Sequence, residues 1–174
     1  MASKFTQKAQ NTLNRSLEIA KELGHTYIGS EHLLLALISE KDSIASRILN
    51  SKGAKAEKIR KAMIEIAGIG SESLVTADDL TPRARKIIER SSAESQKSAT
   101  KYIGTEHLLI AILEERDCMA VRLLEAEGVP ASELKLDLSA YLGSTEKGYS
   151  ISHSSKESEE KSKQKSSSAV TLFG

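Results

Sequence analysis

The apolar residues of this chain are concentrated in two short runs that the sequence spells almost identically. The phrase YIGSEHLLLALI occupies residues 27–38, and YIGTEHLLIAIL occupies residues 102–113. In each phrase six consecutive apolar residues follow a Glu-His pair. A run that is apolar on all faces predicts a helix buried at the centre of its unit, and this run is far too short to span a membrane.

The two phrases belong to an internal duplication that covers most of the chain. A shift of 75 positions aligns residues 6–68 with residues 81–143 without a gap, and 20 of the 63 aligned positions are identical. Three of the identical pairs are glycines at positions where a helix should begin or end. The sequence therefore predicts two copies of one structural unit, joined by residues 69–80.

Capping residues at matching positions predict where the helices of each copy start. Threonine is a good N-cap for the first helix, and Pro82 occupies a first helical position, where its missing N–H costs nothing. The expected caps of the first three helices are Thr6, Ser30 and Asp42 in one copy and Thr81, Thr105 and Asp117 in the other. An acidic residue then opens the second helix of each copy, where it complements the helix dipole.

Glycines predict where the helices end. The expected ends are about residue 23 or 98 for the first helix, Gly53 or Gly128 for the third, and Gly68 or Gly143 for a fourth helix over roughly 55–66 or 131–142. We therefore expect an all-α fold, in which two tandem four-helix repeats with pseudo-twofold symmetry fill residues 1–143. A low aromatic content of 3% fits a helical core.

The composition changes from Ser144 onwards. The segment 144–168 contains ten serines, five lysines and four glutamates among its 25 residues, with almost nothing apolar. Too few apolar side chains are present to offset the entropy of ordering, so we expect a disordered, flexible linker over residues 144–174. Its last six residues, AVTLFG, become apolar again.

Charge and composition argue against several functional classes. The 25 basic residues balance the 24 acidic ones, which leaves neither a footprint for nucleic acid nor a long-range attraction to an acidic membrane. The first ten residues contain no apolar region typical of a signal peptide. The single Cys118 fits a reducing compartment, and we expect a cytoplasmic protein.

The repeated motifs resemble a known family. The pattern T-x-[KR]-A at the first helix, followed by Y-I-G-[ST]-E-H-L-L, occurs twice with a spacing of 75 residues. This arrangement is similar to the double Clp-N repeat at the amino terminus of bacterial Hsp100 unfoldases, in particular those of the ClpC type. The resemblance covers residues 4–143, and the closing TLFG looks like the lead-in to a first ATPase module. A stand-alone Clp-N protein is the alternative.

The resemblance implies a recognition domain for adaptor proteins and substrates. Such a domain passes its clients to an ATPase ring and thereby, indirectly, to a ClpP-type protease. In ClpC proteins it also recognises phosphorylated arginine at two equivalent sites. The positions that carry this role over to the present chain are Glu31, Thr6, Gly29 and Ser30, and Glu106, Thr81, Gly104 and Thr105. A fragment of this kind is expected to be monomeric.

The residue types at these positions suit phosphoarginine independently of the family. A carboxylate binds a guanidinium group through paired hydrogen bonds, and the open N–H groups of a helix start bind phosphate. Each repeat offers a glutamate at a helix start, and Thr6 or Thr81 adds a hydroxyl if the first helix starts nearby. Since Gln7 lacks the preset φ of Pro82, the first site could be less rigid.

Less specific interpretations remain open. Glu31 and Glu106 are also ordinary first-turn acids, and the domain could dock adaptors without binding phosphoarginine at all. Because neighbours on a helix face different ways, His32 and His107 do not form a metal site with these glutamates, and we expect each histidine to fix its helix start by hydrogen bonding. Cys118 falls at a helix start, where a thiol pKa can be lowered, but no partner is indicated.

Catalytic motifs are absent from the sequence. Neither the Walker A pattern G-x-x-x-x-G-K-[ST] nor the hydrolase pattern G-x-S-x-G occurs. A rival reading makes the two Glu-His pairs acid–base groups of a small enzyme, but adjacent residues rarely converge on one substrate. We expect no enzyme activity, metal or cofactor in this chain, with ATP and Mg²⁺ belonging only to an ATPase module outside it.

Overall fold

Both repeats begin with a helix that a threonine hydroxyl caps. The computed structural model describes residues 4–146, and in it the Thr6 hydroxyl accepts the N–H of Ala9 at 3.1 Å, while the Thr81 hydroxyl accepts that of Ala84 at 3.0 Å. Helices α1 (Gln7–Glu22) and α5 (Pro82–Lys97) follow from these caps. Their predicted starts and ends are confirmed to within one residue.

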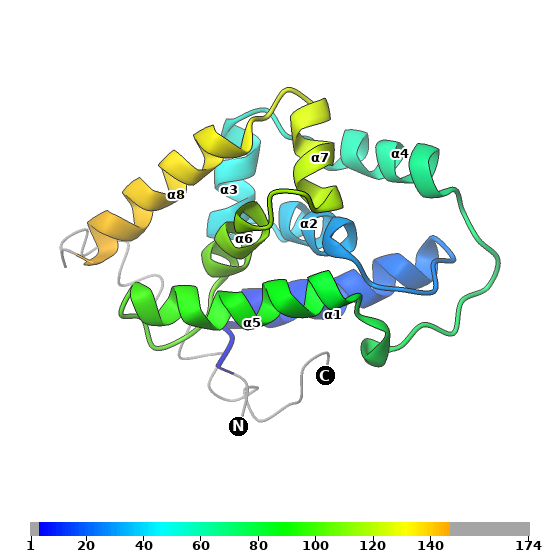
Figure 1. Cartoon of the computed structure of the whole chain (residues 1–174), viewed down its shortest axis with the longest axis horizontal. Helices are drawn as coiled ribbons and strands as arrows, with labels where there is room; N and C mark the ends of the chain where they lie inside the picture. Colours follow the sequence, from blue (N-terminus) through cyan, green and yellow to red (C-terminus); the bar gives the residue numbers. More distant parts are fainter. Residues whose placement is uncertain (1–3, 147–174) are drawn as a thin grey trace.

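The two apolar runs form the central helices. Helices α2 (Ser30–Ser39) and α6 (Thr105–Glu114) lie in the middle of Figure 1, with α1 and α5 on one side and the remaining helices on the other. All six apolar residues of each run are buried. The predicted all-α fold is confirmed, since the described residues contain eight α-helices and only isolated β-bridges. No helix in this range is long and apolar enough to cross a membrane.

The second and third helices start one residue away from their predicted caps. Gly29 and Gly104 are the N-caps of α2 and α6, so that Ser30 and Thr105 are already helical. Helices α3 (Ile44–Ser51) and α7 (Met119–Ala126) are capped at Ser43 and Cys118 rather than at the preceding aspartates. The physical reason at Asp42 is its left-handed backbone, φ 64°, which places it in the turn and leaves the Ser43 hydroxyl to accept the N–H of Ser46.

The fourth helices differ in length. Helix α4 (Ala56–Ala67) ends as predicted at Gly68, whose φ of 74° turns the chain away. Helix α8 (Ala131–Glu146) instead continues through Gly143, so the predicted end there is wrong. A helical glycine costs only about 1 kcal/mol relative to alanine, which the rest of a helix can offset. The linker predicted over residues 144–174 therefore starts within α8, and its remainder, 147–174, lies outside the described residues.

The repeats exchange contacts across their pseudo-twofold axis. Phe5 pairs with Ile103, and the equivalent Leu80 pairs with Ile28, each pair as a single parallel β-bridge. Helix α3 packs on α8 of the other repeat, and α4 packs on α7. The connection 69–80 is part of the same body, because Val75 and Leu80 are buried and a short 3-10 turn, Ala77–Asp79, leads into α5. One hydrophobic core thus runs through both repeats.

Candidate functional site

The start of each first helix lies against the glutamate phrase of the other repeat. The Thr81 N–H donates to the carbonyl of Ile28 at 3.0 Å, and the Thr6 N–H donates to the carbonyl of Ile103 at 2.8 Å. Glu31 follows Ile28 by three residues, so its neighbouring helix start is that of α5. The nearby threonine expected from the sequence is therefore present, but it comes from the other repeat. Each threonine hydroxyl accepts a capping N–H and still has its own O–H to donate.

A glycine makes room for each glutamate side chain. A Cβ at Gly29 would lie 2.6 Å from Oε1 of Glu31, and a Cβ at Gly104 would come closer still to Oε1 of Glu106. The carboxylates therefore fold back over the helix starts into space that any larger residue would occupy. This close approach explains why the phrase contains glycine directly before the Ser-Glu or Thr-Glu pair.

Each histidine fixes its helix start, as predicted. Nδ1 of His32 accepts the N–H of Gly29 at 2.9 Å, and Nδ1 of His107 accepts the N–H of Gly104 at the same distance. Both imidazoles are completely buried. Within the described range, no group of three His, Cys, Asp or Glu side chains is placed to hold a metal ion.

In the first repeat this cap extends into a chain of hydrogen bonds. Nε2 of His32 lies 2.8 Å from Nδ1 of His25, and Nε2 of His25 lies 2.9 Å from the carbonyl oxygen of Gly68. Because Gly29 donates to Nδ1 of His32, the chain is satisfied when both imidazoles are neutral with the proton on Nε2. Burial, with the neighbouring His25 adding to it, lowers the pKa of His32 to about 3. The chain links the start of α2 to the end of α4.

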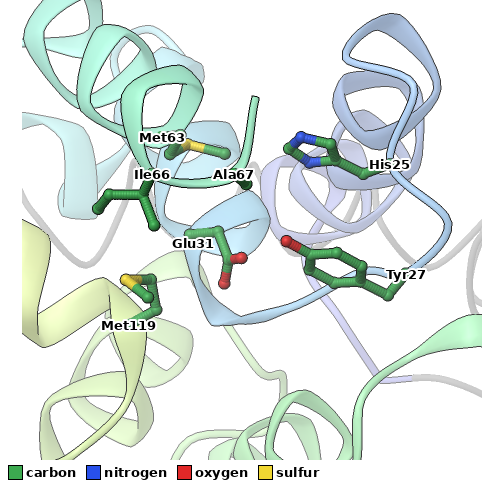
Figure 2. Close-up of a pocket in the computed structure, with 7 residues that line it drawn as sticks. All are labelled: His25, Tyr27, Glu31, Met63, Ile66, Ala67 and Met119. Carbon is green, nitrogen blue, oxygen red and sulfur yellow. The ribbon is translucent and has the colours of Figure 1, made fainter. Parts of the chain in front are cut away.

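Tyr27 lies against this histidine pair. Its ring stacks on His25 with 5.5 Å between centroids and meets His32 edge-on at 5.1 Å. Its hydroxyl faces the carboxylate of Glu31 (Figure 2). Burial, then the charge of Glu31 and a hydrogen bond to it, raise the pKa of Tyr27 to about 12. The phenol therefore stays neutral and donates a hydrogen bond to the carboxylate.

A small cavity opens beside Glu31. It has a volume of about 40 Å³, and residues from α2, α4 and α7 meet there (Figure 2). The residues that line it, here called the Glu31 cavity, are His25, Tyr27, Glu31, Met63, Ile66, Ala67 and Met119. Glu31 itself is partly exposed, as is Thr81 at the start of α5. The Glu31 cavity thus combines one carboxylate with an apolar wall.

In the second repeat the equivalent glutamate is buried. Glu106 is only 2% exposed and Thr6 only 1%. The positions equivalent to Met63, Ile66 and Ala67 hold the residues Leu138, Tyr141 and Leu142. Tyr141 lines a hollow of about 310 Å³ together with Ile44 and Ile48, and Glu106 does not line it. The two glutamates are equivalent in sequence but not in exposure.

Ser30 and Thr105 face the interior between the repeats. The Ser30 hydroxyl accepts the N–H of Ala120 at 3.0 Å, and the Thr105 hydroxyl accepts the N–H of Ala45 at 3.2 Å. Each hydroxyl therefore stabilises the start of a helix in the other repeat. Cys118 is buried beside Ser30, and burial raises the pKa of its thiol, which makes it less reactive than its helix-start position indicates.

Several residues of the site were not predicted from the sequence. Tyr27 is identical in the two copies, and that identity is the signal that could have found it. His25, Met63 and Ile66 carry no such signal, because the second copy has other residues at their positions. Met119 comes from the second repeat, so only the packing of the two repeats brings it to Glu31.

Comparison with known sequences places this arrangement among Clp proteins. The chain is 39% identical over 150 residues to "Negative regulator of genetic competence ClpC/MecB" of Bacillus subtilis (strain 168), a match to 86% of this chain and 18% of the relative. It is 37% identical over 146 residues to "Chaperone protein ClpB" of Oceanobacillus iheyensis, with 84% of this chain and 18% of that relative covered. The chain thus spans about a fifth of the length of these relatives.

Solved structures agree on the fold. The N-terminal domain of the chaperone ClpD from Arabidopsis thaliana matches with a TM-score of 0.66 and 23% identity, over 80% of this chain and 97% of that domain. The N-domain of ClpV from Vibrio cholerae matches with a TM-score of 0.61 and 17% identity, over 80% of this chain and 86% of that domain.

The sequence profile of the family finds the duplication directly. It matches residues 4–127 and again residues 79–168, so that both glutamate phrases fall within matched segments. With the repeated helices, their exchanged contacts and these matches in agreement, the chain belongs to the family described as Clp repeat (R) N-terminal domain.

Proposed function

We propose that this chain is a recognition domain that binds arginine-phosphorylated proteins and adaptor proteins for an attached Clp-type ATPase. The ATPase would unfold the clients and pass them to a ClpP-type protease. Relatives named as ATP-binding subunits of an ATP-dependent Clp protease support the connection to an ATPase. A complex of the ClpV N-domain with VipB peptide, which matches with a TM-score of 0.62, supports the capacity of this fold to hold a peptide.

The observation that carries the proposal is the bond from the start of α5 to Ile28, three residues before Glu31. The Glu31 carboxylate would pair with the guanidinium group of phosphoarginine through two hydrogen bonds. Thr81 is held next to this phrase by the 3.0 Å bond to Ile28, and its hydroxyl and the positive end of α5 would face the phosphate. Gly29 leaves space for the carboxylate, and Ser30 would contribute by fixing the start of α7 rather than by touching the ligand.

Burial of Glu106 favours a second function for the other half of the domain. Glu106 is only 2% exposed, and Thr6 only 1%. This burial suits a structural role for Glu106, Gly104 and Thr105 unless a ligand opens the site. In that case the second repeat would serve adaptor docking without phosphoarginine.

A calorimetric titration tests the proposal. Residues 1–174 would be titrated with free phosphoarginine, with arginine and phosphoserine as controls. We expect saturable binding of phosphoarginine that the Glu31→Ala/Glu106→Ala double variant loses while its circular dichroism spectrum stays helical. A folded wild-type chain that binds no phosphoarginine would leave adaptor docking as the function.

A further inference from the structure

We propose that the Glu31 cavity and its rim recognise two neighbouring residues of a peptide, a phosphoarginine and an adjoining apolar residue. The inference rests on the proposed function and extends it from a single modified side chain to a short sequence. Its basis is that a carboxylate and exposed apolar residues line the same cavity, which a receptor for free phosphoarginine would not need.

The charge of the cavity selects the basic head group. Among the described residues that line it, Glu31 is the anionic one, and none is a lysine or arginine. Tyr27 donates a hydrogen bond to the carboxylate and so orients it within the cavity. A carboxylate favours the planar guanidinium group over a lysine ammonium group, because two parallel hydrogen bonds can form.

The size of the cavity places the rest of the peptide outside it. A volume of about 40 Å³ accommodates roughly three water-sized groups, which is enough for one edge of the guanidinium group and too little for its phosphate or for a second side chain. The adjoining residue must therefore lie on the rim. There the side chain of Ile66 is 60% exposed on the last turn of α4, and Met119 of α7 is partly exposed next to the same cavity.

This rim is suited to an apolar side chain of variable shape. Large exposed apolar residues are uncommon in the described part of the chain, where they are Ile66, Ile69, Leu74 and Leu136. Of these, Ile66 is the one that lines a cavity containing a carboxylate. Methionine side chains are flexible and polarisable, so Met119 and Met63 can adapt to a leucine, a valine or a methionine of the peptide.

In the second repeat the glutamate and the apolar residues do not line one cavity. Tyr141 and Ile44, at the positions of Ile66 and Met119, line a hollow from which Glu106 is absent. The carboxylate and the apolar surface are thus separate in one repeat and joined in the other. We therefore expect one site of this kind in each chain.

Fluorescence anisotropy with short labelled peptides tests the inference. Three peptides would carry phosphoarginine with leucine before it, with leucine after it, or with glycine on both sides. We expect at least one leucine peptide to bind about fivefold to tenfold more tightly than the glycine peptide, as burial of one apolar side chain allows. The gain should disappear in Ile66→Ser, a substitution at an exposed position, and should persist in the matched control Leu136→Ser.

A parallel titration with free phosphoarginine distinguishes a failure of the inference from a failure of the proposed function. If free phosphoarginine binds but leucine gives no gain, or the gain survives Ile66→Ser or is lost equally in Leu136→Ser, the inference is overturned and the proposed function stands. If free phosphoarginine and all three peptides fail to bind, the proposed function is wrong and the inference fails with it.

Discussion

The two repeats use the same phrase, Gly-[ST]-Glu-His, but give its glutamate different surroundings. In both repeats the histidine caps the helix start and the glycine leaves space for the carboxylate. Glu31 is partly exposed beside a cavity, whereas Glu106 is 2% exposed. The duplication has thus kept the local backbone of the phrase and changed what covers it.

The last helix also differs between the two repeats. Helix α4 ends at Ala67, and the carbonyl of Gly68 accepts the hydrogen bond from His25. Helix α8 continues through Gly143, and it has Tyr141 and Leu142 where α4 has Ile66 and Ala67. The helix that lines the Glu31 cavity is thus shorter and carries smaller side chains at these two positions than its equivalent in the second repeat. A single copy of a repeated motif can therefore become specialised through residues well outside the motif.

Substitution of the two phrase glycines should show the largest effect of this difference. A Cβ at either position meets a glutamate carboxylate. Glu31 can swing into solvent, so Gly29→Ala should lower the free energy of unfolding by less than about 1 kcal/mol. Glu106 has no such exit, so Gly104→Ala should cost about 2–3 kcal/mol as an overpacked buried site. Urea unfolding measures both, and equal costs would contradict the difference in burial.

Acid should destabilise the protein through the histidine chain of the first repeat. The folded state holds the pKa of His32 near 3, whereas an unfolded histidine titrates near 6.5. The unfolded state therefore takes up a proton first as the pH falls from about 6.5 towards 3. Between pH 6.5 and pH 5 the free energy of unfolding should fall by about 2 kcal/mol from this group.

A His32→Asn variant provides the control for this pH dependence. Asparagine can still accept the N–H of Gly29 through its side-chain oxygen, but it does not titrate. The variant should be less stable at neutral pH, and its stability should depend less on pH between 6.5 and 5. Parallel pH profiles for the two proteins would show that His32 is not the titrating group.

The smallest expected difference concerns an arginine that both repeats share. Arg15 pairs with Glu18 and Glu22, which are exposed, so Arg15→Ala should cost about 0.5 kcal/mol. Arg90 pairs with Glu94, whose side chain is only 9% exposed and also pairs with Lys97, so Arg90→Ala should cost about 1 kcal/mol. Thermal unfolding of the two variants ranks them, and a larger loss for Arg15→Ala would reverse the expected order.

Much of the fold could be predicted because its signals are local. Thr6 and Thr81 cap the helices that follow them, and His32 and His107 bond to a backbone N–H three residues away. Such contacts depend on residue type and spacing, which the sequence gives directly. The cap at Ser43 was missed by one residue, because a serine and an aspartate side by side compete for the same role. Cys118 was missed because its side chain makes no capping hydrogen bond.

The composition of the site could not be predicted for a different reason. A gap-free duplication does not reveal which copy packs on which, and here Thr81 of the second repeat bonds to Ile28 of the first, while Met119 lines the same cavity as Glu31. The end of α8 also escaped prediction, since a glycine such as Gly143 is compatible with a helix end and with a helix interior. Exposure of a side chain depends on these long-range contacts.

The central claim is that the two glutamates, identical in sequence, are unequal as binding sites. Calorimetric titration of phosphoarginine into the single variants Glu31→Gln and Glu106→Gln tests it most directly, with helical content measured as a control. We expect Glu31→Gln to lose the tighter binding, with affinity reduced at least tenfold, and Glu106→Gln to retain it. Equal losses in the two variants, or a loss confined to Glu106→Gln, would contradict this account.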